Sequence, residues 1–127
     1  MALQASPPFK LTILICEDEP LILFEAAEVL RHNGHSVIET MTATDALTHL
    51  DRSIDILIAD VSLPDMSGVD LAKMARKTAP DVGVIFATAH DDLPELSEIS
   101  SARMLVKPYG EEDLLRMVHA LASTRQK

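Results

Sequence analysis

The sequence predicts an α/β fold in which helices cover both faces of one parallel sheet. Five short apolar runs have the length of strands, and segments with helical spacing separate them. Strands that alternate with helices in this way require right-handed crossovers and therefore a parallel sheet. At 127 residues the chain is long enough for one domain and too short for two ordinary ones. We expect tails at 1–9 and 125–127 and a domain at 10–124.

The N-terminal part predicts two strands that flank a helix. The first strand, 11–16, is almost wholly apolar, whereas the second, 36–40, is more polar and is placed at a sheet edge. The helix between them begins at Pro20 and stops near Gly34. Its apolar residues recur at three- and four-residue spacing: Leu21, Phe24, Ala27, Val29 and Leu30.

The middle of the chain predicts a short helix over 44–50, a strand over 54–60 and a helix over 69–79. The short helix has a threonine near its start as N-cap. The strand is apolar on both faces, as in the centre of a parallel sheet, and it ends on Asp60. The expected inward residues of the two helices are Ala46, Leu47, Leu50, Leu71, Met74 and Ala75.

The C-terminal part predicts two more strands, 82–87 and 102–106, and two helices. The helix near 94–101 has few apolar residues to bury, which fits a mobile element. The last helix, 111–123, starts with three acidic residues that suit the helix dipole. Its expected inner face consists of Leu114, Val118, Leu121 and Ala122.

Composition argues against several classes of function. Eleven Lys and Arg against twenty Asp and Glu give a net charge of -9, which disfavours direct binding to nucleic acids or anionic membranes. The one cysteine, Cys16, has no partner for an internal disulfide, which suits a reducing compartment. Because no apolar run approaches eighteen residues, we expect a cytoplasmic protein.

Reactive side chains follow four of the five predicted strands. Glu17 and Asp18 follow the first, Asp60 ends the third, Thr88 follows the fourth and Lys107 follows the fifth. In the doubly wound order 2-1-3-4-5 of flavodoxin-like folds, these four strands are neighbours. Their carboxyl ends, and hence these side chains, would meet at one edge of the sheet.

Such a site needs a positive ion. Two unit charges about 4 Å apart repel by roughly 4 kcal/mol at an effective dielectric near 20, so three carboxylates in one pocket are unstable alone. Hard oxygen ligands suit Mg²⁺, and no Cys/His spacing indicates zinc. A cation, a lysine and a hydroxyl around one carboxylate are the groups that phosphoryl transfer requires.

With these motifs the chain resembles a receiver domain of the two-component response regulators over about residues 10–123. The matching residues are Glu17-Asp18, Asp60 with Leu63-Pro64-Asp65-Met66-Ser67-Gly68 behind it, Thr88-Ala89 and Lys107-Pro108. Each motif alone is common, but all of them in register on strands of the right length are specific.

The resemblance implies that Asp60 is the phosphoacceptor, which attacks a phosphohistidine on a sensor histidine kinase or a histidine phosphotransfer protein. Asp18, Asp60 and the Ser62 backbone carbonyl would bind Mg²⁺ directly, and Glu17 would act through water. By the same resemblance, Lys107 pairs with the Asp60 carboxylate and then with the phosphoryl group.

The resemblance also implies a switch. Thr88 donates to a phosphoryl oxygen and moves toward it, and the surface made by the fourth strand, the helix near 94–101, the fifth strand and the last helix repacks. The downstream partner is not identified, and a weak homodimer through this surface is left open. Beyond self-catalysed phosphorylation and dephosphorylation, no enzyme activity is implied.

Several positions depart from the family or tune it. Met104 stands where the family usually has an aromatic that follows the threonine, and Tyr109 either takes part of that role or is an ordinary edge aromatic. Ser62 and His90 lie two beyond the phosphoacceptor and the threonine, positions that tune phosphoryl loss, with Ala89 between Thr88 and His90. His90 either positions water or is a solvated loop residue.

Two alternatives to the switch are considered. An aspartyl phosphatase resembling the haloacid dehalogenases would have a second Asp two residues after the nucleophile, where this chain has Ser62. A pseudo-receiver, which binds proteins with weak or no phosphorylation-driven switching, usually lacks the acceptor, the acids or the lysine. This chain has all of them, although Met104 leaves the strength of the switch open.

Overall fold

The computed structural model describes residues 10–51 and 53–125, so the tail predicted at 1–9 lies outside the described residues. In chain order the elements are β1 Thr12–Cys16, α1 Pro20–His32, β2 Ser36–Thr40, α2 Ala43–Leu47, β3 Ile56–Asp60, α3 Gly68–Thr78, β4 Gly83–Thr88, the 3-10 helix η1 Pro94–Glu98, β5 Arg103–Val106 and α4 Glu111–Arg125.

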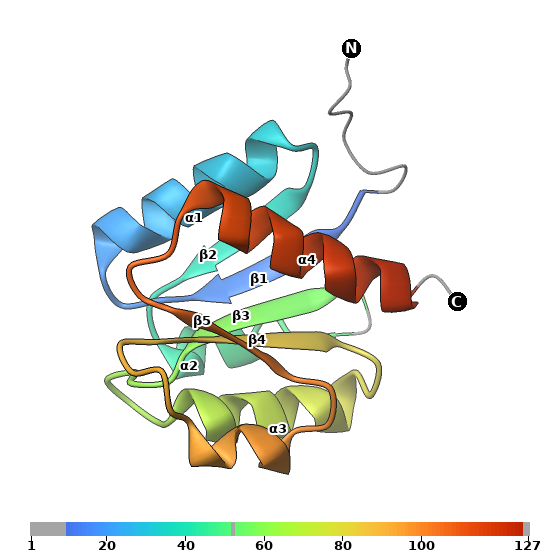
Figure 1. Ribbon diagram of the computed structural model, residues 1–127. Coiled ribbons are helices and arrows are strands. Elements are labelled where there is room, and N and C mark those ends of the chain that lie inside the picture. Colours follow the sequence, from blue (N-terminus) through green and yellow to red (C-terminus); the bar gives the residue numbers. More distant parts are fainter. Residues whose placement is uncertain (1–9, 52, 126–127) are drawn as a thin grey trace.

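All five strands pair in parallel in the order β2-β1-β3-β4-β5 (Figure 1), which confirms the predicted fold class. The polar strand β2 lies at an edge and β3 in the centre, as predicted. β3 is buried along its whole length, because α1 and α4 cover one face of the sheet and α2, α3 and η1 cover the other. A strand covered in this way has to be apolar on both faces.

Two hydrophobic cores lie on the two faces of the sheet. Because alternate strand residues point to opposite faces, Ile13 and Ile15 of β1 pack with α1 and α4, whereas Leu14 and Cys16 pack with α2 and α3. The predicted inner residues of α4 are all buried: Leu114, Val118, Leu121 and Ala122.

The apolar spacing that predicted α1 does not coincide with its buried face. Leu21 and Phe24, two of the residues with this spacing, are 69% and 56% exposed. The buried residues are Leu23, Ala26, Ala27 and Leu30. At roughly 100° per residue, Leu21 and Phe24 lie far around the helix from the stripe centred on Leu23 and Leu30.

The second and third helices differ from the prediction in detail. α2 covers Ala43–Leu47, so it starts one residue earlier and ends three residues earlier than predicted. Its N-cap is a threonine near its start, as predicted: the Thr42 hydroxyl accepts a hydrogen bond from the Asp45 N–H at 3.1 Å. In α3, Met74 is 42% exposed and Ala72 is buried in its place. The more polar face of α3 therefore includes one of the predicted inward residues.

The helix predicted near 94–101 is only the 3-10 helix η1, and none of its residues is buried. Its C-terminal end is attached to α3 by the Lys73–Glu98 ion pair at 2.6 Å. Arg76 adds hydrogen bonds to the Ser100 hydroxyl and carbonyl oxygens at 3.2 and 2.9 Å. The next residue, Ser101, has a φ of 61°, in the left-handed region that side chains disfavour.

At the amino edge of the sheet, His119 of α4 packs against His35, which precedes β2. The His35 and His119 rings meet edge to face with centroids 5.8 Å apart. His35 Nδ1 accepts a hydrogen bond from the Leu11 N–H at 3.2 Å, so its Nε2 carries the proton. Burial lowers the pKa of both imidazoles, and both stay neutral near pH 7.

Among the helices of the described residues, none is both long and apolar enough to span a membrane.

Candidate functional site

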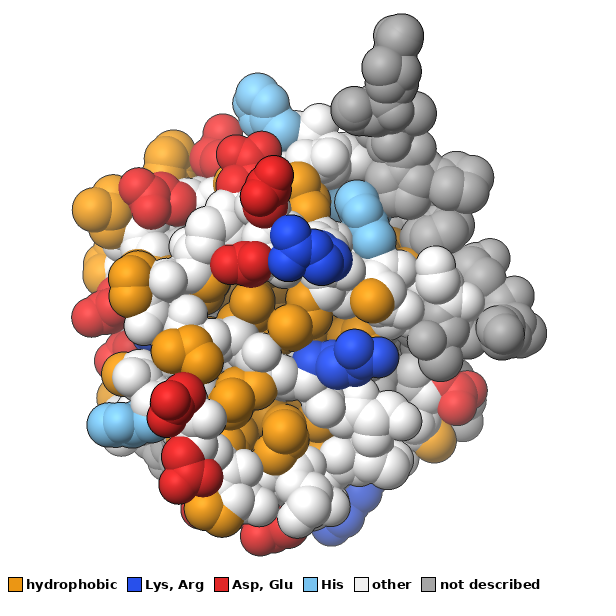
Figure 2. Space-filling model, in the orientation of Figure 1, with side chains coloured by type: hydrophobic (Ala, Val, Ile, Leu, Met, Phe, Trp, Pro, Cys, Tyr) orange, Lys and Arg blue, Asp and Glu red, His pale blue; other side chains and the backbone are white. Residues whose placement is uncertain are grey.

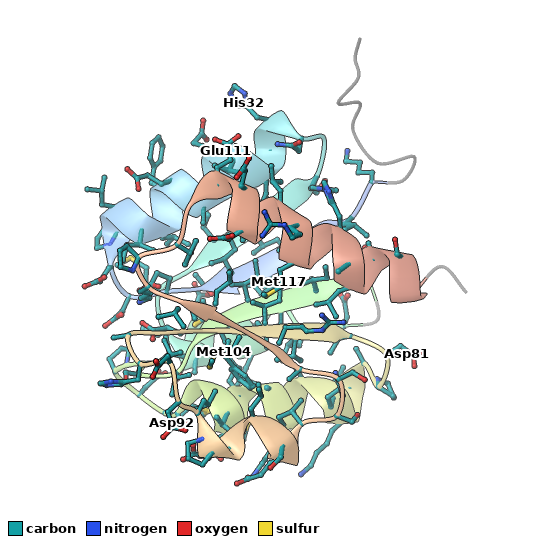
Figure 3. The ribbon with its side chains drawn as sticks, viewed as in Figure 1. His32, Asp81, Asp92, Met104, Glu111 and Met117 are labelled. Atoms are coloured by element: carbon teal, nitrogen blue, oxygen red, sulfur yellow. The ribbon has the colours of Figure 1, made fainter. Side chains whose placement is uncertain are left out.

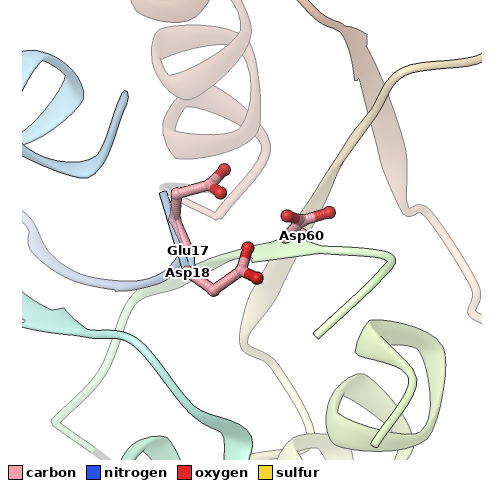
Figure 4. Close-up of side chains that lie close together, drawn as sticks. All are labelled: Glu17, Asp18 and Asp60. Atoms are coloured by element: carbon pink, nitrogen blue, oxygen red, sulfur yellow. The ribbon is translucent and has the colours of Figure 1, made fainter. Parts of the chain in front are cut away.

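Three carboxylates from two neighbouring strands meet at the carboxyl edge of the sheet. Glu17 and Asp18 follow β1 and Asp60 ends β3, and one oxygen of each lies within 4.8 Å of the others (Figure 4). Glu17 and Asp60 are 3% and 7% exposed, whereas Asp18 is open to solvent. The structure thus brings together the acids that the sequence placed on separate strands.

Local structure fixes Glu17 at this edge. The Glu17 N–H continues the sheet by donating to the Thr40 carbonyl at 3.0 Å. Its carboxylate turns back to accept a hydrogen bond from the Glu19 N–H at 3.1 Å, and Pro20 then begins α1. Because the backbone binds Oε2, the other carboxylate oxygen, Oε1, is left for Lys107.

Lys107 lies between two of the acids. Its Nζ is 2.8 Å from Glu17 Oε1 and 3.0 Å from Asp60 Oδ2, and its own N–H donates to the Thr88 carbonyl at 2.7 Å. Burial opposes the charge of the ammonium, but the hydrogen bonds to Glu17 and Asp60 outweigh it and raise the pKa of Lys107. Burial also raises the pKa of Glu17, against the hydrogen bond from Lys107.

One ammonium does not balance three carboxylates. Asp18 and Asp60 border a pocket of about 590 Å³ that also includes Ser62, Thr88, Ala89, His90 and Asp92. A further cation in this pocket would relieve the repulsion. The available ligand atoms are hard carboxylate and carbonyl oxygens, which suit Mg²⁺ rather than a soft metal. The residues present therefore fit the predicted ion.

The loop after β3 holds the second oxygen of Asp60. Asp60 Oδ1 accepts a hydrogen bond from the Ser62 N–H at 3.0 Å. The loop closes through an isolated antiparallel bridge between Ser62 and Ser67, and the Gly68 N–H donates to the Val61 carbonyl at 2.9 Å. A Cβ at Gly68 would lie 2.1 Å from the Asp60 carbonyl oxygen, so only glycine fits there.

Thr88 is the last residue of β4, and it borders the pocket from the side of that strand. Thr88 is 5% exposed, and its Oγ accepts a hydrogen bond from the His90 N–H at 3.1 Å. Accepting this bond uses a lone pair of the hydroxyl oxygen and not its proton. The proton can therefore be donated to a ligand in the pocket. Ala89 and His90 are exposed on the pocket wall, which keeps both interpretations of His90 open.

Met104 and Tyr109 lie beside the pocket rather than in it. Met104 is half-buried on β5 and shares a surface groove with Tyr109 and Met117. Tyr109 follows the cis Lys107–Pro108 bond, and burial of the ring raises the pKa of its phenol to about 12. The cis bond could not be inferred from the sequence.

Sequence reasoning missed the contacts of Asp65. It named this residue only as part of the loop motif, but Asp65 accepts three hydrogen bonds from the start of α2. The donors are Ala43 and Thr44, which stand 22 and 21 residues earlier in the chain. No spacing rule within one element could have shown this contact.

Comparison with known proteins agrees with the geometry. A family model described as the response regulator receiver domain matches residues 13–119. The positive alginate biosynthesis regulatory protein of Pseudomonas aeruginosa is 34% identical over 110 residues, covering 82% of this chain and 44% of that protein. The transcriptional regulatory protein LytR of Staphylococcus aureus is 30% identical over 123 residues, covering 90% of this chain and 48% of that protein.

Solved structures show the same likeness. A response regulator receiver domain protein from Clostridium thermocellum superposes with a TM-score of 0.82 at 28% identity, covering 91% of this chain and 97% of that one. The chain spans less than half the length of the two curated relatives named above. In contrast, the match covers nearly the whole chain of the Clostridium thermocellum protein.

Proposed function

The chain belongs to the response regulator receiver domain family, and on this premise we propose that it is a phosphorylation-dependent switch with Asp60 as the phosphoacceptor. The observation that carries the proposal is the position of Asp60. It is nearly buried, is held by Lys107 on one oxygen and by the Ser62 N–H on the other, and faces the pocket that Thr88 borders. This arrangement combines a nucleophile, a fixed cation and a hydroxyl donor.

In the proposed reaction, a carboxylate oxygen of Asp60 attacks the phosphorus of a phosphohistidine. The phosphorus–nitrogen bond breaks, and the leaving imidazole nitrogen takes a proton from solvent. Lys107 transfers its contact from the Asp60 carboxylate to the phosphoryl oxygens, and the free hydroxyl proton of Thr88 is donated to another. Asp18, Asp60 and the Ser62 carbonyl would hold Mg²⁺, which neutralises charge on the transferred group.

The phosphodonor would dock on the exposed apolar part of α1. Leu21 and Phe24 are exposed at the start of this helix, and Ile22 between them borders the site pocket. Phe24 and Ile22 also line a mostly apolar pocket of about 410 Å³ between α1 and α4. A sensor histidine kinase or phosphotransfer protein would cover these side chains while its phosphohistidine reaches Asp60.

Replacing Leu21 and Phe24 together by serine tests this docking surface. Both side chains are exposed, so the fold should persist while transfer from a protein phosphodonor slows at least several-fold. Labelling by a small phosphodonor should stay at the wild-type rate. Equal slowing with both donors would show that the two residues support the site itself and would remove the docking proposal.

The output surface would consist of β4, η1, β5 and α4. Apolar side chains gather over this face (Figure 2), and Met104 and Met117 lie on the β5 and α4 sides of it (Figure 3). Movement of Thr88 toward the phosphoryl group would pull on residues 89–92, which lead into η1. Since no residue of η1 is buried, moving this helix costs little free energy.

We propose no turnover of a separate substrate, only self-catalysed gain and loss of the phosphoryl group, and a protein rather than a nucleic acid or a membrane as the partner. The net charge of -9 supports this choice. The alternative is a pseudo-receiver with little switching. Met104 favours it, because a flexible thioether transmits the position of Thr88 less well than an aromatic ring.

Incubation with a small phosphodonor and Mg²⁺ tests the proposal. Mass spectrometry should find one phosphate on the wild type and none on Asp60→Asn, whereas the exposed control Asp70→Asn should be labelled like the wild type. Labelling that persists in Asp60→Asn would refute the site. Amide exchange of β4, η1, β5 and α4 before and after labelling then distinguishes the switch from the pseudo-receiver. A switch should change its exchange in these elements on phosphorylation, whereas a pseudo-receiver should not.

A further inference from the structure

The side chain of Asp65 connects the loop after β3 to the start of α2. Asp65 Oδ1 accepts a hydrogen bond from the Ala43 N–H at 2.9 Å. Asp65 Oδ2 accepts two more, from the Thr44 N–H at 2.8 Å and the Thr44 hydroxyl at 2.6 Å. One carboxylate thus joins two elements that are not adjacent in the chain.

These donors are groups that a helix leaves without partners. The first N–H groups of a helix have no carbonyl to donate to, and a charged acceptor binds them more strongly than a neutral one. Thr42 caps only the Asp45 N–H, and Asp65 takes the two N–H groups before it. The Thr44 hydroxyl, together with these N–H groups, holds the pKa of Asp65 at about 2, so the carboxylate stays ionised.

At its base the loop is attached to β4, where the Val61 N–H donates to the Ala87 carbonyl at 3.0 Å, and Leu63 and Met66 pack against the core. Its other hydrogen bonds close the loop on itself. Ser62 and Ser67 form an antiparallel bridge, the Gly68 N–H is bound to the Val61 carbonyl, and the Ser67 hydroxyl caps the Val69 N–H at 3.0 Å. These contacts shape the loop but do not attach its tip to another element. The hydrogen bonds of Asp65 supply that attachment, five residues after Asp60.

We propose that Asp65 is a positioning residue: by hydrogen bonding to the start of α2 it holds the loop over 61–67 so that Asp60 and the Ser62 carbonyl bind a divalent cation together. The inference rests on the proposed function, because it assumes that Asp60 and Ser62 share such a cation. Asp65 itself lies outside the cluster of Glu17, Asp18 and Asp60 and does not border the pocket. Its effect passes through the loop, much as outer-shell partners orient metal ligands.

The test compares variants that weaken the start of α2 in different ways. Asp65→Ala removes all three hydrogen bonds to the loop, and Thr44→Val removes only the one from the hydroxyl. Thr42→Ala is the matched control, because it removes an N-cap of the same helix without touching the loop. For each, the Mg²⁺ dissociation constant is measured by calorimetry, together with the melting temperature and amide exchange at Ser62 and Gly68.

We expect Asp65→Ala to weaken Mg²⁺ binding about tenfold, the lower end of the effect of outer-shell partners, and to speed exchange at Ser62 and Gly68. Thr44→Val should weaken binding about two- to threefold, between Asp65→Ala and the wild type. Thr42→Ala should lower the melting temperature and leave Mg²⁺ affinity unchanged. Since Asp65→Ala also removes a charge, the titration is repeated in about 0.5 M salt, where long-range Coulomb effects are screened but positioning persists.

Three results would overturn the inference. They are wild-type affinity in Asp65→Ala, an equal loss of affinity in Thr42→Ala, and a loss that disappears in high salt. Should Asp65→Ala fail to fold, Thr44→Val decides, because it keeps the carboxylate and both backbone donors. A wild-type protein that binds no Mg²⁺ would instead overturn the proposed function and with it this inference.

Discussion

Polar side chains at the two edges of the parallel sheet differ in how far their charges are balanced by neighbouring groups. At the carboxyl edge, Lys107 pairs with Glu17 and Asp60, whereas Asp18 has no such partner in the described part of the chain and borders an open pocket together with Asp60. At the amino edge, Asp55 accepts the Thr12 N–H at 2.8 Å, and His35 binds the Leu11 N–H as a neutral ring. One edge keeps electrostatic repulsion that a ligand can relieve, whereas the other binds two backbone N–H groups with side chains and buries the neutral rings of His35 and His119, whose Nε2 atoms have no hydrogen-bond partner within the described residues. The comparison indicates that function and stability are divided between them.

The largest predicted effect is that of Gly68→Ala at the carboxyl edge. Because the added Cβ would lie 2.1 Å from the Asp60 carbonyl oxygen, the loop must shift. We expect the free energy of unfolding to fall by about 3 kcal/mol, the upper part of the usual range for overpacking, and labelling at Asp60 to be lost. Urea unfolding and mass spectrometry measure the two effects.

Gly110→Ala is the control for this prediction. Gly110 also lies at the carboxyl edge, before α4, but a Cβ there meets nothing within 4 Å. It should leave both stability and labelling close to wild type. A Gly68→Ala protein that is labelled normally would show that the loop does not position Asp60.

The next effect concerns pH and the amino edge. Burial depresses the pKa of His35 and His119 in the folded protein, so the unfolded chain binds protons more readily. The stability that they contribute is therefore complete above the unfolded pKa, near 6.5, and is lost as the pH falls through it toward the lower folded pKa. The slope is at most about 1.4 kcal/mol per pH unit for each group.

His119→Phe should reduce this slope, since the ring keeps its packing but cannot be protonated. Denaturant unfolding at pH 7.5 and at pH 5.5 measures the difference, and phosphate labelling at neutral pH should not change. If the variant lost as much stability on acidification as the wild type, His119 would not be a source of the pH dependence. If labelling fell, the two edges would not be independent.

The smallest predicted effect is a gain. Ser101 has a φ of 61°, a conformation that costs an ordinary residue roughly 1–2 kcal/mol and glycine almost nothing. Glycine also gives the unfolded chain more freedom, so Ser101→Gly should stabilise the protein by only about 0.5 kcal/mol. Thermal unfolding measures the gain. A loss of stability would mean that contacts of the serine side chain outweigh the backbone strain.

Much of the fold followed from the sequence, because strands covered on both faces must be apolar on both faces. The runs ending at Cys16 and Asp60 were recognised in this way, and their carboxyl ends located the acidic cluster. The stripe of α4 was also predicted correctly. In α1, Leu21 and Phe24 fitted a three- and four-residue spacing as well as Leu23 and Leu30 do, and spacing alone does not tell which face meets the sheet.

The missed features depend on contacts between distant parts of the chain. Asp65 bonds to α2, and His35 meets His119 only because the fold brings β2 and α4 to the same edge. The reduction of the predicted fourth helix to η1 had a partial signal in its low apolar content. Its attachment through Arg76 had none, since the acceptors are the hydroxyl and carbonyl oxygens of Ser100, which stands 24 residues later in the chain.

The place of Tyr109 gives this protein a built-in optical reporter. The chain has no tryptophan and one tyrosine, so its intrinsic fluorescence comes from a single ring. That ring is half-buried and stands two residues beyond Lys107, and the charges of Glu17, Lys107 and Asp60 all act on it. We therefore expect the emission of Tyr109 to respond to a change in the charge of the pocket, without any dye or label.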